Sequence, residues 1–157
     1  MDPSAPPPHA SSSLDSDFDI QNLQHGVKTV WFKPREVLEI LQNYERFPIQ
    51  YKTQKPPSGS WFLFDRKVHR FYRSDGYQWQ KRMDGKSDYE AHEYLEVDNV
   101  RALNCYSGHV EKKPTFQRRI YWTLEPAYQH IVLVHYRDVL KVCLLFYLPF
   151  VTTDLQF

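Results

Sequence analysis

Cysteine is scarce in this chain of 157 residues, which contains only Cys105 and Cys143. Cysteines that bind a metal usually stand in pairs about two to four residues apart, whereas these two lie in different parts of the chain. A disulfide framework and a zinc site are therefore not expected. The expectation is a protein of a reducing compartment.

The short motifs that mark many enzymes are also missing. The sequence has no P-loop, no G-x-S-x-G turn and no dinucleotide fingerprint. Its seven histidines, His92, His109 and His135 among them, show no paired ligand spacing such as H-E-x-x-H. Asp75-Gly76 and Asp84-Gly85 resemble pieces of a calcium loop but lack its alternating oxygen ligands. We expect no enzyme, no metal and no cofactor.

Long apolar runs are absent too. The longest, residues 142–151, is interrupted by Pro149, and a spanning helix needs about 20 apolar residues. The first residues, which include Pro6-Pro7-Pro8, lack the basic start and apolar stretch of a signal peptide. No membrane partner is expected.

The net charge of +1 hides an uneven distribution of charge. Residues 1–24 contain four aspartates and no lysine or arginine, whereas residues 52–86 contain nine basic and three acidic residues. An acidic segment joined to a basic body favours a polyanionic partner. The alternative is an ordinary solvated surface, because charge patterning is only a weak guide.

The composition predicts three regions. Residues 1–24 are rich in Pro, Ser and Asp and are expected to be disordered. Residues 25–139 are expected to form one folded domain. Residues 140–157 form an apolar extension that resembles the end of a truncated product.

The sequence of residues 25–139 predicts an α+β domain in which one long and one short helix pack on a mainly antiparallel strand meander. Lys33-Pro34 opens the long helix, because proline is tolerated in a first turn. Its apolar face holds Val37, Ile40, Leu41 and Tyr44 at helical spacing. A capping box from Ser87 to Glu90 predicts the short helix over residues 88–94. Strands are predicted at 61–64, 67–73, 77–82, 103–106, 118–124 and 131–136.

Basic and aromatic residues alternate between positions 61 and 86, so that aromatic rings could fill a core while cations face a phosphate backbone. A second basic stretch follows at 112–119. The residues predicted to contact DNA are Arg66, Lys67, Arg70, Arg73, Lys81, Arg82, Lys86, Arg118 and Arg119. A weakly specific nuclear localisation patch is formed by Lys112, Lys113, Arg118 and Arg119.

Arg118 and Arg119 are neighbours on one predicted strand, so their side chains point to opposite faces. Arg119 shares a face with Tyr121 and Thr123. We interpret that face as the more polar one and predict that Arg119 binds DNA while Arg118 supports the fold.

Many short stretches resemble, in the same order, the CG-1 domain of the calmodulin-binding transcription activators of plants and animals. They are Glu39–Tyr44, Pro57–Ser60, Phe62–Lys67, Asp75-Gly76 with Trp79, Asp84–Lys86, Glu90–Glu93, Phe116–Arg119 with Tyr121-Trp122, and Ile131–Arg137. The resemblance implies a nuclear domain, without catalysis, that binds double-stranded DNA at elements with a CGCG core. Calmodulin is not expected to bind this chain, because the family's calmodulin-binding region does not lie in it.

The chain departs from the family pattern at Ser74, Gln80 and Met83, where basic residues are usual, and at Tyr94 and Glu96, where lysines are common. These departures favour an alternative function, a truncated protein-interaction module of the same family that binds DNA poorly. A third possibility is binding of single-stranded nucleic acid. That function needs exposed rings at Tyr72, Tyr77 and Trp79.

Overall fold

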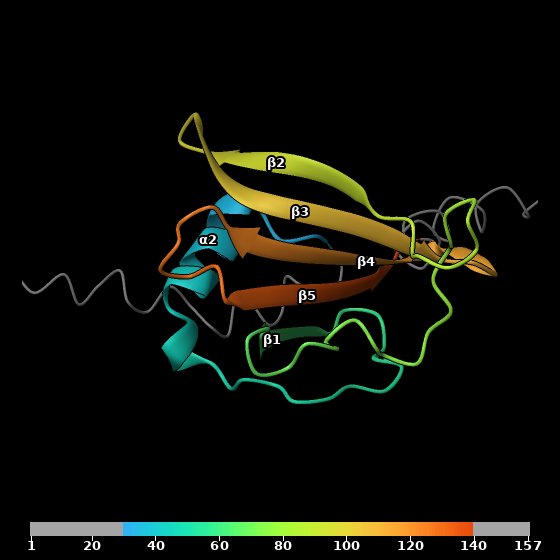
Figure 1. Cartoon of the computed structure of the whole chain (residues 1–157). Helices are drawn as coiled ribbons and strands as arrows, with labels where there is room; N and C mark the ends of the chain where they lie inside the picture. The colour runs from blue at the N-terminus through green and yellow to red at the C-terminus, as the bar shows by residue number, and fades with distance from the viewer. Residues whose placement is uncertain (1–29, 140–157) are drawn as a thin grey trace, which may run out of the picture.

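A five-stranded antiparallel sheet forms the centre of the molecule (Figure 1), which is described by a computed structural model for residues 30–139. The strand order is β1-β5-β4-β3-β2. The strands are β1 (Trp61–Asp65), β2 (Ala91–Val97), β3 (Val100–Val110), β4 (Lys113–Thr123) and β5 (Ile131–Asp138). The predictions for residues 1–24 and 140–157 lie outside the described residues. Within 30–139, no helix combines the length and apolar character that crossing a bilayer requires.

Helix α2 (Pro34–Gln42) begins where the sequence predicts. Pro34 occupies the first turn, and the Glu36 carboxylate accepts a hydrogen bond from the backbone N–H of Lys33 at 2.8 Å. Val37, Ile40 and Leu41 are buried against the sheet, as their spacing predicts. A short 3₁₀ turn, Tyr44–Arg46, follows α2.

The sheet is covered on both faces. On one face α2 packs over a cluster that includes Leu103, Tyr121 and Leu133. On the other face the long connection between β1 and β2 packs over a second cluster, which includes Ile120 and Val134. Interior strand β5 is therefore buried on both sides from Ile131 to Tyr136, as its unbroken apolar sequence predicts.

Three predicted elements are wrong, although the α+β class is confirmed. Residues 67–73 and 77–82 do not form strands; they are turns and irregular loop, joined to the rest by isolated bridges such as Trp79–Val110. Their aromatic side chains pack down on the sheet instead of pairing edge to edge. Residues 88–94 do not form a helix, because residues 91–97 pair with β3 as strand β2.

Candidate nucleic-acid interface

A buried polar network holds the connection 66–90 on the sheet. Asp75 is 1% exposed, and its carboxylate accepts three side-chain hydrogen bonds. Arg118 on β4 donates at 2.8 Å, the Tyr136 hydroxyl on β5 donates at 2.8 Å, and the Trp79 indole N–H donates at 2.9 Å. One carboxylate therefore joins the connection to the neighbouring strands β4 and β5.

Arg118 completes this network from below the connection. Its side chain is 1% exposed, its guanidinium lies 4.1 Å from the Trp79 ring centroid, and it donates to the backbone oxygen of Arg73 at 3.1 Å. A buried charge is tolerated only when it is paired and hydrogen-bonded, and Asp75 supplies that pairing. Burial, and next the negative charge of Asp75, raise the pKa of the Tyr136 hydroxyl.

The turn after Asp75 also positions a neighbouring loop. Gly76 has a positive φ of 86°, and a Cβ at this position would lie 2.4 Å from the Gln54 side chain. The backbone N–H of Lys55 donates a hydrogen bond to the backbone carbonyl oxygen of Asp75 at 2.6 Å. The loop around residues 52–55 therefore lies against the connection that carries the predicted DNA contacts.

Four of the predicted contacts are exposed cations, and no ion pair is recorded for them among residues 30–139: Lys67, Arg70, Arg82 and Lys86. Arg82 and Lys86 flank a turn that Asp84 closes by accepting the backbone N–H groups of Lys86 at 2.8 Å and Ser87 at 3.1 Å. These bonds lower the pKa of Asp84. In Figure 1 this turn lies at the same end of the sheet as the turn between β3 and β4, and backbone bonds such as Gln80 N–H to His109 oxygen, at 2.9 Å, join the two regions.

Three other predicted contacts have partners within the protein. Arg73 pairs with Glu90 at 3.0 Å, and Lys81 pairs with Asp88. The Arg66 guanidinium lies over the Trp122 ring, 4.7 Å from its centroid. Binding a phosphate through these side chains would compete with contacts that already exist.

Arg118 and Arg119 lie on opposite faces of β4, as predicted, but neither face is polar. Arg118 is inside the molecule, so we leave it out of the surface available to DNA. Arg119 is half-buried, and its guanidinium lies 4.4 Å from the Trp31 ring centroid. Its strand neighbours Tyr121 and Thr123 are fully buried. The prediction that Arg119 lies on the more polar face of β4 was therefore wrong, because α2 covers that side of the sheet.

The predicted localisation patch is divided by the fold. Lys112 is exposed in the turn between β3 and β4, and Lys113 pairs with Asp138 at 3.0 Å. Arg118 is buried and Arg119 lies against Trp31. The four cations do not form one exposed cluster.

Two exposed cations, Lys52 and Lys55, were not among the residues predicted from the sequence. Both belong to the nine basic residues of positions 52–86. They were not predicted as DNA contacts because they precede the stretch 61–86, in which basic and aromatic residues alternate. Only the contact with the Asp75–Gly76 turn brings them beside the connection.

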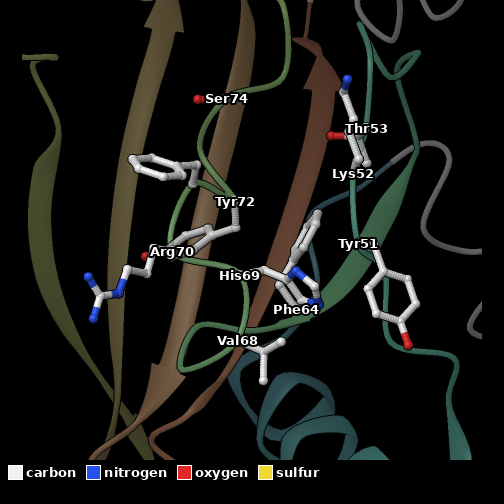
Figure 2. Close-up of a pocket in the computed structure, with 10 residues that line it drawn as sticks. Tyr51, Lys52, Thr53, Phe64, Val68, His69, Arg70, Tyr72 and Ser74 are labelled. Atoms are coloured by element: carbon white, nitrogen blue, oxygen red, sulfur yellow. The ribbon is translucent and has the colours of Figure 1, made fainter.

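The rings considered for stacking on single-stranded nucleic acid are not exposed. Trp79 and Tyr72 are buried and Tyr77 is half-buried, which argues against that function at these positions. Tyr51 and Phe71 are exposed instead, and both line a pocket of about 390 Å³ beside β1. Figure 2 shows this pocket with Tyr51 on one side.

Two features that could support catalysis, a reactive thiol and a metal site, are both absent from residues 30–139. Cys105 is a buried free thiol whose pKa burial raises to about 11, so it is a poor nucleophile. No group of three or more His, Cys, Asp or Glu side chains in residues 30–139 is arranged to hold a metal ion.

Comparison with known proteins assigns the fold to a family. A family model described as the CG-1 domain matches residues 26–139. Calmodulin-binding transcription activator 4 of Arabidopsis thaliana is 51% identical over 135 residues, which cover 85% of this chain and 13% of that protein. Calmodulin-binding transcription activator 2 of Homo sapiens is 46% identical over 86 residues, or 54% of this chain and 7% of that protein.

A rice relative, calmodulin-binding transcription activator CBT of Oryza sativa subsp. japonica, is 42% identical over 123 residues, or 78% of this chain and 13% of its own length. This chain therefore spans only a small part of the curated relatives it matches. No solved structure matches it. The family model covers all of the described residues, and this chain belongs to the CG-1 domain family.

Proposed function

We propose that this chain binds double-stranded DNA sequence-specifically, at elements containing CGCG, as part of a nuclear transcription regulator. The observation that carries the proposal is a set of exposed cations on a connection fastened to the sheet by buried Asp75. The names of the relatives, which are transcription activators, support the same proposal.

The exposed set suits both parts of duplex recognition. Lysine and arginine bind phosphates, which fixes the position of a protein on DNA without reading its sequence. Arginine can also donate two hydrogen bonds to the O6 and N7 atoms of guanine in the major groove. Arg70 and Arg82 are the arginines of this exposed set, and a CGCG element presents guanines on both strands. We assign base contacts to these two residues and phosphate contacts to Lys67 and Lys86.

The buried network supports binding by fixing the cations before DNA arrives. A loop that is already ordered loses less conformational entropy when it binds. Asp75 is therefore a positioning residue in this proposal, while the side chains that touch DNA lie elsewhere on the same connection.

A competition gel shift tests the proposal. The chain should prefer a CGCG duplex to a scrambled duplex by about 4–10 kcal/mol, the usual margin of specific over non-specific binding. Arg70→Ala and Arg82→Ala should reduce that preference without lowering the melting temperature. The matched control is Lys33→Ala, which removes an exposed cation on the α2 side of the sheet. Equal affinity of the unmodified chain for both duplexes would contradict specific recognition.

The second candidate is a protein-interaction module that binds DNA poorly. The exposed apolar side chains of Tyr51, Val68 and Phe71 favour it, because clustered apolar surface often marks an interaction site. Weak binding with a steep salt dependence, and no preference for CGCG, would support this alternative.

A further inference from the structure

The pocket beside β1 has an apolar floor and an exposed apolar rim. It lies between residues 51–53 and 68–74, with Phe64 between the two segments (Figure 2). Phe64 and Tyr72 are buried, whereas Tyr51, Val68 and Phe71 are 73%, 68% and 82% exposed. Side chains this exposed add little to the core, so the rim is available for a ligand.

The charge around the pocket is positive. Lys52 and Arg70 line it, Lys67 precedes the second segment, and no ion pair is recorded for any of the three in the range 30–139. No aspartate or glutamate is among the described residues that line it. The pocket therefore suits a short peptide with an apolar side chain flanked by carboxylates.

The chain itself contains a segment of this chemistry. Residues 14–20 read Leu-Asp-Ser-Asp-Phe-Asp-Ile, and no lysine or arginine occurs before Lys28. In an extended segment, neighbouring side chains point in opposite directions. Phe18 would then point one way, with Asp17 and Asp19 directed to the other side.

We propose that residues 14–20 bind in this pocket, with Phe18 between Tyr51 and Phe71, and that the long side chains of Lys52 and Arg70 reach around the rim to the outward-directed carboxylates of Asp17 and Asp19. Ile20 and Val30 are ten positions apart, so the chain between them can extend over about 33 Å, which is comparable to the diameter of a small domain. Because the segment is tethered, its effective concentration at the pocket is in the millimolar range. A weak contact is then enough to keep the pocket occupied.

The occupied state has a consequence that rests on the proposed function. Arg70 is one of the proposed DNA contacts, so residues 14–20 and DNA would compete for it. Because Arg70 is assigned a base contact, the acidic segment would lower affinity for the CGCG duplex more than for the scrambled duplex.

Chymotrypsin cleavage of the full chain after Phe18 tests the occupancy without DNA. Phe71→Ser removes an exposed rim ring and should accelerate cleavage after Phe18 by about threefold or more, because cleavage follows the population of the open form. The matched control is Met83→Ser, a fully exposed apolar side chain outside the pocket, which should leave the rate unchanged. An Asp17→Asn, Asp19→Asn double variant should accelerate cleavage as Phe71→Ser does, and the two effects should not add.

A second measurement reports from the pocket side. In NMR spectra of the full chain, Phe18→Ala should shift the signals of Val68 and Phe71, while Leu23→Ala, in the same region of sequence, should not. Equal cleavage in the Phe71→Ser and Met83→Ser variants, or unchanged pocket signals in Phe18→Ala, would overturn the proposal. So would pocket signals that respond only to an added acidic peptide. If Phe18 is protected from chymotrypsin but the chain binds no DNA, the result would support binding of residues 14–20 in the pocket and would contradict the proposed DNA-binding function.

Discussion

At the scale of single residues, Asp75 illustrates how a short polar side chain can organise a long connection. Its partners Arg118 and Tyr136 come from the neighbouring strands β4 and β5, and Trp79 comes from the connection itself. The sequence places Asp75-Gly76 in a turn but gives no sign that the carboxylate is buried. The alternation along β4 separates Arg118 from Arg119, yet it cannot reveal that both faces of the strand are covered.

Replacing Asp75 should destabilise the domain strongly. Asp75→Ala leaves the buried Arg118 guanidinium with only Glu90, 3.8 Å away, as an acidic partner, and breaking a buried pair in this way costs about 3–5 kcal/mol. Chemical denaturation measures the loss as a change in the free energy of unfolding. The control Asp84→Ala removes an exposed carboxylate and should change the stability far less; similar losses in both variants would contradict the central role of Asp75.

Tyr136 should make the domain sensitive to alkaline pH. Burial raises its pKa in the folded state above the ordinary value of 10.0, so above about pH 10 the unfolded chain releases a proton that the folded chain retains. Stability is then fully present below pH 10 and falls as pH rises further. The loss is about 1.4 kcal/mol per pH unit for one proton.

Tyr136→Phe should make this alkaline decline shallower, while buried Tyr121, whose pKa burial also raises, keeps part of it. The variant should also lower stability near neutral pH by about 1.5–3 kcal/mol, because it deletes one hydrogen bond to the Asp75 carboxylate. Urea unfolding between pH 8 and pH 11 provides the measurement. Tyr89→Phe, at a half-exposed position, serves as the control. An identical pH profile in Tyr136→Phe and the unmodified chain would remove Tyr136 as a source of the decline.

At the scale of elements, the helix and the strand that were predicted correctly have apolar residues at a regular spacing in the sequence. Helix α2 shows the pattern at Val37, Ile40 and Leu41, and strand β5 shows an unbroken apolar run. Strand β2 was missed because its residues are mostly exposed and a capping-box sequence precedes them. The overlooked signal was Asp98-Asn99, since both residues take positive φ, at 53° and 65°, as in the tight turns that join antiparallel strands.

The Asp98-Asn99 turn should respond to β-branched substitution. Asn99→Val places such a side chain at positive φ, which costs roughly 1–2 kcal/mol, whereas Asn99→Gly should be neutral or slightly stabilising. Thermal unfolding followed by circular dichroism compares the two variants. Equal melting temperatures would show that this turn does not constrain the pairing of β2 with β3.

At the scale of the whole molecule, the sheet separates two covers with different roles. Helix α2 closes one face with apolar packing, and the connection 66–90 closes the other with a buried ion pair and exposed cations. The α+β class and the basic character of the connection could be predicted from sequence. The sorting of its cations into exposed and internally paired groups could not, because it depends on acids such as Glu90 and Asp88 that only the fold brings near.

Adding one cation to the connection should test whether this side faces DNA. Met83 is fully exposed beside Arg82. Met83→Lys should raise the affinity for CGCG and scrambled duplexes by similar factors, and it should steepen the slope of log affinity against log salt by about 0.9. The gain should fade at high salt, where screening is strong. Met83→Gln, which adds no charge, is the control, and a salt slope that matches this control would place Met83 outside the interface.

The network at Asp75 also bears on the order of events during synthesis of the protein. The connection 66–90 leaves the ribosome well before Tyr136, which lies 61 positions after Asp75, and β1 must wait for the same strand before it can pair. Contacts so distant along the chain form late and slow the folding of a domain. In a nascent chain that does not yet include β5, the connection 66–90 lacks its hydrogen bond to Tyr136. We therefore expect the exposed cations to take up their fixed positions only after β5 has been synthesised.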